Sequence, residues 1–235
     1  IFTDPSYYGQ IMVTTNAHIG NYGYSNDEVE SQSVKISGLV CKDFNFHNSR
    51  YGSFGDLQAY FEKEKIVCIY DVDTRALVRY IRNKGAMNAI IASNNLDIQD
   101  LKTKLAKVPS MEGLELSSFV STKKAYTLGD EQSKYRVSVL DFGVKSSILK
   151  CLTERGVFIK VFPLNSSLTD IYDFQPTGIF LSNGPGDPSV MNKSISISQS
   201  ILNRNVPVFG ICLGHQLMAL AGGLKTFKMH TGHRG

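Results

Sequence analysis

Cys212 is the residue whose type and surroundings most clearly indicate chemistry. It lies in the run Val206-Pro-Val-Phe-Gly-Ile-Cys-Leu-Gly-His-Gln216, where an apolar strand leads through Gly-x-Cys-x-Gly into an apolar helix. This pattern is typical of a nucleophile elbow with sulfur in place of oxygen. Gly210 and Gly214 leave room for a sharp turn. The helix amino terminus favours a thiolate, the form of cysteine that attacks a carbonyl carbon. We therefore predict that Cys212 is a catalytic nucleophile rather than a buried structural cysteine.

A second pattern, Phe180-Leu-Ser-Asn-Gly-Pro-Gly-Asp-Pro-Ser189, follows an earlier strand. Gly184 and Gly186 bracket a proline, so the backbone N–H groups of this loop are accessible to a ligand. Together with the N–H of Leu213, they could form an oxyanion hole for a tetrahedral intermediate at Cys212. By itself the pattern is equally typical of an ordinary turn. Because the pattern occurs together with the elbow, we favour a ligand-binding site over an ordinary turn.

The elements that must position these residues alternate along the second half of the chain. We predict strands at 136–142, 158–163, 178–182 and 206–211, separated or followed by helices at 145–155, 170–174, 192–204 and 213–221. This alternation predicts a parallel sheet covered on both faces. Right-handed crossovers then bring the functional loops to the carboxyl ends of the strands.

The first half is predicted to be a mixed α+β domain. Its apolar patterns indicate strands at 10–15, 33–41, 66–70 and 87–92, and helices at 56–63, 73–83 and 97–107. The polar stretch 121–134 resembles a linker. We therefore expect an amino-terminal domain at 1–122, a linker at 123–134 and a second domain at 135–235.

Composition argues against several other classes of protein. The net charge is +4 and the basic residues are scattered, which does not favour nucleic acid as a partner. No apolar run approaches the roughly 18 residues of a membrane span. The four cysteines form no Cys-x-x-Cys pair, which indicates a reducing, cytoplasmic compartment. No nucleotide-binding or metal-binding motif is present, and the spacing of His230 and His233 is weak evidence for a metal.

Both motifs resemble those of the class I, triad-type glutamine amidotransferases. Further segments resemble the small, glutamine-hydrolysing subunits of carbamoyl phosphate synthetases, a likeness that spans essentially the whole chain. The first half selects this family, since other amidotransferases of the class do not share it. The segments are Thr3-Asp-Pro-Ser-Tyr7, Gly9-Gln-Ile11, His18-Ile-Gly-Asn-Tyr-Gly23, Asp73-Thr-Arg-Ala-Leu77, Leu140-Asp-Phe-Gly143 and Lys225-Thr-Phe-Lys-Met229.

The resemblance implies an α/β fold in which the mixed amino-terminal domain precedes an open parallel-sheet amidotransferase domain. It implies glutamine hydrolysis through a thioester at Cys212. The ammonia would pass to a large synthetase subunit, which makes carbamoyl phosphate from bicarbonate and ATP with magnesium, for arginine and pyrimidine biosynthesis. No cofactor is expected on this chain itself. The residues that the resemblance assigns to glutamine binding are Ser6, Gly184, Gly186, Leu213 and Gln216.

The sequence departs from the family pattern after the elbow. In the family, a His and a Glu two residues later supply the general base and its orienting carboxylate. They do not occur in this sequence, and His215, one helical turn beyond Cys212, is not assigned as the base. The amidotransferase domain is therefore expected to be incomplete at its carboxyl end, and the chain to be a piece of a longer protein at both ends.

Two other functions are compatible with these residues. One is a different cysteine amidotransferase or thiol hydrolase, although the amino-terminal half argues against it. The other is a non-catalytic or truncated amidotransferase-like interaction protein that has kept the elbow without its base.

Overall fold

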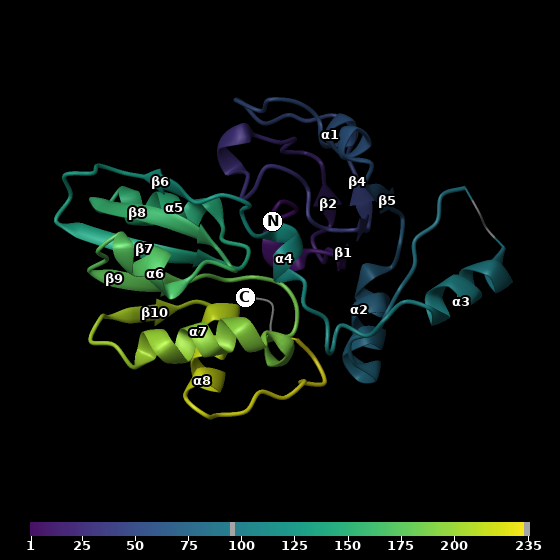
Figure 1. Cartoon of the computed structure of the whole chain (residues 1–235). Coiled ribbons are helices and arrows are strands. Elements are labelled where there is room, and N and C mark those ends of the chain that lie inside the picture. Colours follow the sequence, from purple (N-terminus) through teal and green to yellow (C-terminus); the bar gives the residue numbers. More distant parts are fainter. Residues whose placement is uncertain (95–96, 233–235) are drawn as a thin grey trace. The chain divides into compact units, whose positions relative to one another are not determined.

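The computed structural model describes residues 1–94 and 97–232. Contacts divide the chain into a first unit, Ile1–Ser110 with the segment that starts at Lys228, and a second unit, Met111–Phe227. Figure 1 labels most of their helices and strands. The second unit therefore starts before the predicted linker, because residues 111–122 pack with it.

Five strands form the sheet of the second unit, in the order β10-β9-β7-β8-β6. Four of them are parallel, as predicted. They are β7 (Tyr135–Asp141), β8 (Val157–Pro163), β9 (Gly178–Leu181) and β10 (Val208–Gly210). The fifth, β6 (Tyr126–Leu128), pairs antiparallel with β8. It lies inside the segment predicted to be a linker, so that part of the chain contributes to the sheet.

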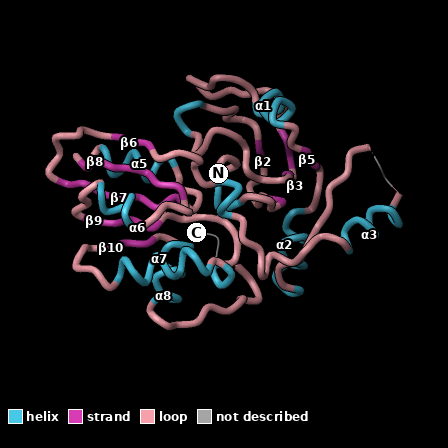
Figure 2. The backbone as a smooth tube through the Cα atoms, in the orientation of Figure 1, coloured by secondary structure: helices cyan, strands magenta, loops and turns pink. Residues whose placement is uncertain are grey.

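Helices cover both faces of this sheet, as Figure 2 shows. Helices α6 (Leu168–Asp173), α7 (Asn192–Leu202) and α8 (Leu213–Ala221) pack with one face. Helix α5 (Ser146–Thr153) packs with the other. Two short elements complete the unit, α4 (Ser117–Val120) and the 3-10 helix η3 (Pro188–Val190).

The sequence of strand β7 is apolar at consecutive positions because both faces of the strand are buried. Val139 belongs to the core beneath α5, whereas Leu140 belongs to the core beneath α6, α7 and α8. Side chains alternate between the faces of a strand, and here both faces are buried. The strand is central, with β8 on one side and β9 on the other. Its carboxyl end therefore lies in the middle of the sheet edge at which the functional loops are predicted to meet.

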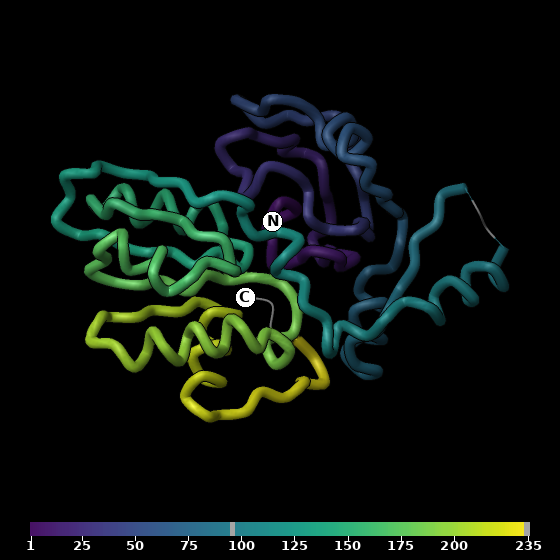
Figure 3. The backbone as a smooth tube through the Cα atoms, in the orientation of Figure 1, coloured from purple at the N-terminus to yellow at the C-terminus, as the bar shows by residue number. Residues whose placement is uncertain are grey.

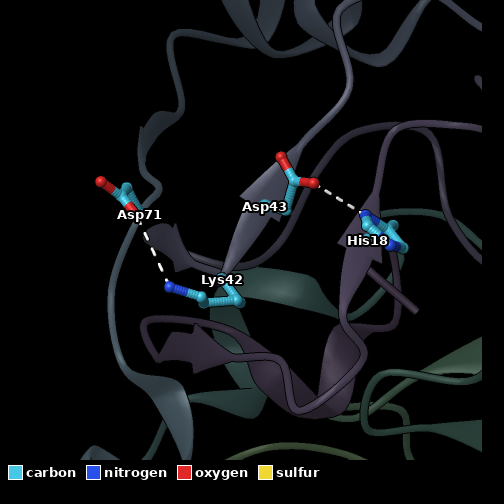
Figure 4. Close-up of polar contacts among 4 residues, drawn as sticks. All are labelled: His18, Lys42, Asp43 and Asp71. Atoms are coloured by element: carbon cyan, nitrogen blue, oxygen red, sulfur yellow. Dashed lines mark hydrogen bonds and ion pairs between the residues drawn. The ribbon is translucent and has the colours of Figure 1, made fainter.

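The described residues of the first unit form two small parallel sheets. Strands β1 (Ile11–Val13), β3 (Gly38–Val40) and β5 (Val67–Ile69) form one. Strands β2 (His18–Ile19) and β4 (Asp43–Phe44) form the other, which places His18 Nδ1 2.8 Å from Asp43 Oδ2 (Figure 4). Lys42 Nζ lies 3.5 Å from Asp71 Oδ1. All four side chains are largely exposed, so each pair contributes at most about 1 kcal/mol.

The helices of the first unit begin where an aspartate can cap them. Helices α1 (Leu57–Glu64), α2 (Thr74–Lys84) and α3 (Ile98–Ala106) follow Asp56, Asp73 and Asp97. Each carboxylate accepts a hydrogen bond from an N–H of the first helical turn. These three predicted helices are confirmed. The unit also contains the 3-10 helices η1 (Pro5–Tyr7) and η2 (Asn26–Glu28).

The strand predicted at 87–92 is wrong, because these residues form a loop. Met87 and Ile90 are exposed, so the apolar pattern here does not mark a buried strand face. Apolar alternation indicates a strand only where a neighbouring strand is available to pair with it.

Candidate active site

Cys212 occupies a strained turn between β10 and α8. Its backbone has φ 52° and ψ −110°, and the side chain is exposed. A positive φ is rare for a residue other than glycine, and such strain costs on the order of 1–3 kcal/mol. It persists only where the flanking structure enforces it. An exposed thiol on a strained strand-to-helix turn is the geometry expected of a nucleophile elbow.

The two glycines of the elbow are required by close backbone contacts. A β carbon on Gly214 would lie 2.1 Å from the carbonyl oxygen of Leu181, at the end of β9. One on Gly210 would lie 2.8 Å from backbone atoms of Gly214 and His215. The first turn of α8 therefore packs directly against the ends of β9 and β10. This contact fixes the position from which the Cys212 side chain projects.

The loop that follows β9 is equally restricted. A β carbon on Gly184 would lie 2.1 Å from the carbonyl oxygen of Phe142, at the end of β7. Gly186 has φ +97°, a conformation that favours glycine, and a β carbon there would lie 2.7 Å from the carbonyl oxygen of Leu114 and 2.8 Å from the backbone nitrogen of Leu116. The loop thus passes between two neighbouring segments with no room for side chains at either glycine.

Hydrogen bonds join this loop region to the elbow. Ile211 N–H donates to the carbonyl of Leu181 at 3.1 Å, and Gly214 N–H donates to the carbonyl of Ser182 at 3.0 Å. A β carbon on Gly184 would also lie 2.9 Å from Leu213 Cδ2. The structure therefore brings Gly184 and Leu213 into direct proximity, next to Cys212.

Three backbone donors in this region remain unpaired. The N–H groups of Gly184, Gly186 and Leu213 donate to no other residue in the part of the chain that the structure describes. Leu213 is the first residue of α8, where an N–H has no partner within the helix. Unpaired donors beside an exposed thiol are what an oxyanion would need.

Asp141 fixes the turn that follows β7 next to the site, a role that the sequence analysis did not assign. It is buried at the end of β7, and its Oδ1 accepts the N–H groups of Gly143 and Val144 at 2.8 Å each. Its Oδ2 accepts the N–H of Thr122 at 2.7 Å. Burial raises the pKa of the Asp141 carboxyl, and the three N–H bonds oppose that rise. The signal was a single charged residue closing an apolar strand in Leu140-Asp-Phe-Gly143.

Asn183 and Ser182 connect the same turn to the Gly184 loop. Asn183 Nδ2 donates to the carbonyl of Gly143 at 2.9 Å. Phe142 N–H donates to Ser182 Oγ at 2.9 Å, and that hydroxyl donates to the carbonyl of Asn183. All three residues are buried. The ends of β7 and β9 are therefore locked together immediately before Gly184.

Gln216 and Ser6 are the two other residues predicted to bind glutamine. Gln216 is exposed on the first turn of α8, and its N–H donates to the carbonyl of Cys212 at 3.0 Å. Ser6 belongs to η1 in the first unit, where its N–H donates to Asp4 Oδ1 at 2.9 Å. The assignment of both residues to glutamine binding stays a prediction.

The described histidines form no site of their own. His215 is exposed on α8, and His230 Nε2 lies 3.2 Å from the carbonyl oxygen of Arg82. His233 lies outside the described residues. Over residues 1–94 and 97–232, no group of three or more His, Cys, Asp or Glu side chains could hold a metal ion.

No helix in the described part of the chain is both long and apolar enough to span a bilayer.

Two family models match the chain. Residues 1–91 match the carbamoyl-phosphate synthase small chain, CPSase domain, and residues 138–235 match glutamine amidotransferase class-I. Carbamoyl phosphate synthase small chains from Pyropia yezoensis and Vibrio cholerae are each 42% identical over 251 residues, and that of Escherichia coli K12 is 41% identical. Each alignment covers 100% of this chain, which spans 65% of the Pyropia protein and 66% of the other two.

Proposed function

Because the chain belongs to the family of carbamoyl phosphate synthase small chains, we propose that it hydrolyses glutamine and supplies the ammonia to a large synthetase subunit. The observation that carries this proposal is the position of Cys212, an exposed thiol on a strained turn. The next residue, Leu213, has an unpaired N–H and lies against Gly184, whose N–H is also unpaired.

The reaction proceeds by nucleophilic attack. The Cys212 thiolate attacks the side-chain amide carbon of glutamine and forms a carbon–sulfur bond, while the carbonyl oxygen becomes an oxyanion. Collapse of this intermediate breaks the carbon–nitrogen bond, and the amine leaves as ammonia after it takes up a proton. Water then hydrolyses the thioester, which releases glutamate and restores the thiol.

The unpaired N–H groups stabilise the oxyanion. Leu213 N–H at the start of α8 and Gly184 N–H in the adjacent loop are the two donors that we assign to it, with Gly186 on the far side of Pro185. Because the elbow and the loop are fixed by backbone contacts, these donors need no rearrangement when charge develops. Gln216 and Ser6 are proposed to contact the substrate.

The attack also requires a proton acceptor for the thiol. No described residue hydrogen-bonds the Cys212 side chain. The family resemblance assigns this role to a histidine, oriented by a glutamate, that follows the elbow in the family. We propose that ATP and magnesium act on the large partner, and that the pair works in the cytoplasm.

The experiment compares two sources of nitrogen for carbamoyl phosphate, using the natural polypeptide with its large partner. In Cys212→Ser, glutamine-dependent synthesis is expected to fall at least about 100-fold, because the hydroxyl is a far weaker nucleophile than a thiolate. Synthesis from added ammonia is expected to be unchanged. The matched control is Cys151→Ser, which alters an exposed cysteine of α5 in the same unit and is expected to leave both activities intact.

Glutamine-dependent synthesis that survives in Cys212→Ser would exclude Cys212 as the nucleophile. A wild-type complex that forms but uses only added ammonia would instead indicate the non-catalytic interaction protein.

A further inference from the structure

Residues 111–122 connect the first unit to the sheet of the second, and they lie against the Gly184–Asp187 loop. Figure 3 follows this path into α4. Glu115 forms an isolated antiparallel bridge with Gly186. Asp187 N–H donates to the carbonyl of Leu114 at 2.8 Å, and Gly113 N–H donates to Asp187 Oδ2 at 2.9 Å. The connecting segment thus behaves as a short strand paired to the loop.

Ser117 holds the connecting segment against the middle of the Gly184–Asp187 loop. Its side chain is fully buried, and Oγ donates to the carbonyl of Pro185 at 3.1 Å. The carbonyl of Pro185 and the N–H of Gly186 belong to the same planar peptide unit, so this hydrogen bond directly helps to orient the unpaired N–H of Gly186. Within the described residues, Ser117 forms no hydrogen bond with Cys212 or with the unpaired N–H groups of the loop.

The far end of the segment is anchored as well. Thr122 N–H donates to Asp141, the same carboxylate that holds the turn after β7. A β carbon on Gly184 would collide with that turn at Phe142, and one on Gly186 would collide with Leu114 and Leu116. The loop is therefore confined between the turn after β7 and the connecting segment.

We propose that residues 113–117 of the connecting segment position the oxyanion-binding loop, with Ser117 as the positioning residue. This inference rests on the proposed function. The segment belongs to the second unit and precedes its sheet in the chain, so residues outside the parallel strands and their helices take part in positioning the loop.

The test compares two serine-to-alanine variants in the natural polypeptide with its large partner. Ser117→Ala removes the hydrogen bond to Pro185. The matched control is Ser138→Ala, because Ser138 is also fully buried in the second unit and donates to the carbonyl of Ile171 at 3.0 Å. Both variants are expected to lose similar stability, since each leaves one buried carbonyl without its hydroxyl donor.

Only Ser117→Ala is expected to change glutamine turnover. We expect kcat for glutamine to fall about fivefold, the factor that corresponds to one net hydrogen bond, with KM little changed, because oxyanion donors act in the transition state. Synthesis from added ammonia should be unchanged. Hydrogen exchange of the peptide that covers 183–187 should accelerate in Ser117→Ala and not in Ser138→Ala.

If the wild-type complex hydrolyses glutamine, equal kcat values in the two serine variants would overturn the proposal, whether or not hydrogen exchange changes. If the wild-type complex does not hydrolyse glutamine, the proposed function fails. The hydrogen-exchange comparison still decides whether Ser117 holds the loop, because that measurement does not depend on glutamine.

Discussion

Gly184 faces the carbonyl oxygen of Phe142 so closely that a β carbon there would lie 2.1 Å from it. That carbonyl cannot move away easily, because the N–H of Phe142 is itself bonded to the buried hydroxyl of Ser182. The sequence pattern suggested that glycine was needed to let substrate approach. The structure shows that the scaffold also requires it.

We therefore expect Gly184→Ala to displace the loop rather than merely to crowd the substrate. The free energy of unfolding should fall by about 1–3 kcal/mol, as in other overpacked positions, and kcat/KM for glutamine should fall at least about tenfold. Urea unfolding and steady-state kinetics measure the two effects. Gly178→Ala is the matched control, since a β carbon there meets its nearest atoms at 3.7 Å. If both variants unfold at the same urea concentration, the close contact with Phe142 does not prevent a larger side chain at position 184.

Replacing Cys212 by glycine should separate stability from activity. Glycine tolerates a positive φ, so Cys212→Gly should relieve strain and raise the free energy of unfolding by up to about 1 kcal/mol, after the entropy cost of a glycine. Cys212→Ser keeps the strain and should match the wild type in stability. Both variants should lose glutamine hydrolysis. A Cys212→Gly protein less stable than Cys212→Ser would contradict the strained turn.

The four cysteines should differ in reactivity towards an alkylating agent at about pH 8. Burial raises the pKa of the Cys68 thiol to about 12, and burial also raises the pKa of Cys41, whereas the side chains of Cys151 and Cys212 are exposed. Iodoacetamide should therefore modify Cys151 and Cys212 first, since the thiolate is the reacting form. Mass spectrometry of the peptides measures each site.

Glutamine should slow the alkylation of Cys212 and leave that of Cys151 unchanged. Cys151 serves as the control because it is exposed on α5. Equal protection of both thiols would indicate a general effect of glutamine on the protein and would remove this support for Cys212 as the nucleophile.

The stability contributed by Asp141 should decrease as pH rises. Burial raises the pKa of this carboxyl above its ordinary value in the folded protein. Its contribution is therefore fully present below the unfolded pKa and is lost as pH rises through the folded pKa. Urea unfolding of the wild type and of Asp141→Asn from about pH 4 to about pH 7 isolates this group. The wild-type advantage over the variant should shrink across that range, and a constant or growing advantage would contradict the direction of the shift.

The elbow could be predicted from sequence because its determinants are local. Gly-x-Cys-x-Gly between an apolar strand and an apolar helix specifies a turn that lacks side chains where chains cross, and the structure has that turn at Cys212. The aspartates at 56, 73 and 97 likewise predicted their helices, because a cap acts within one turn.

The supports of the site could not be predicted in this way. Asp141 accepts an N–H from Thr122, and Ser117 reaches Pro185, so both depend on segments far apart in the chain. The strand predicted at 87–92 failed for the converse reason, since its local pattern found no strand to pair with. Pairing and burial are properties of the folded chain, and a single local pattern does not determine them.

Strand β6 has a consequence for solubility. Without it, β8 would be the outer strand of the sheet, with a row of unpaired N–H and C=O groups facing outward. Such edges promote association between molecules, and a short antiparallel strand is one way to block them. A polypeptide that began at Tyr135 would lack this cover and would be prone to edge-to-edge aggregation. One that began at Met111 would keep it.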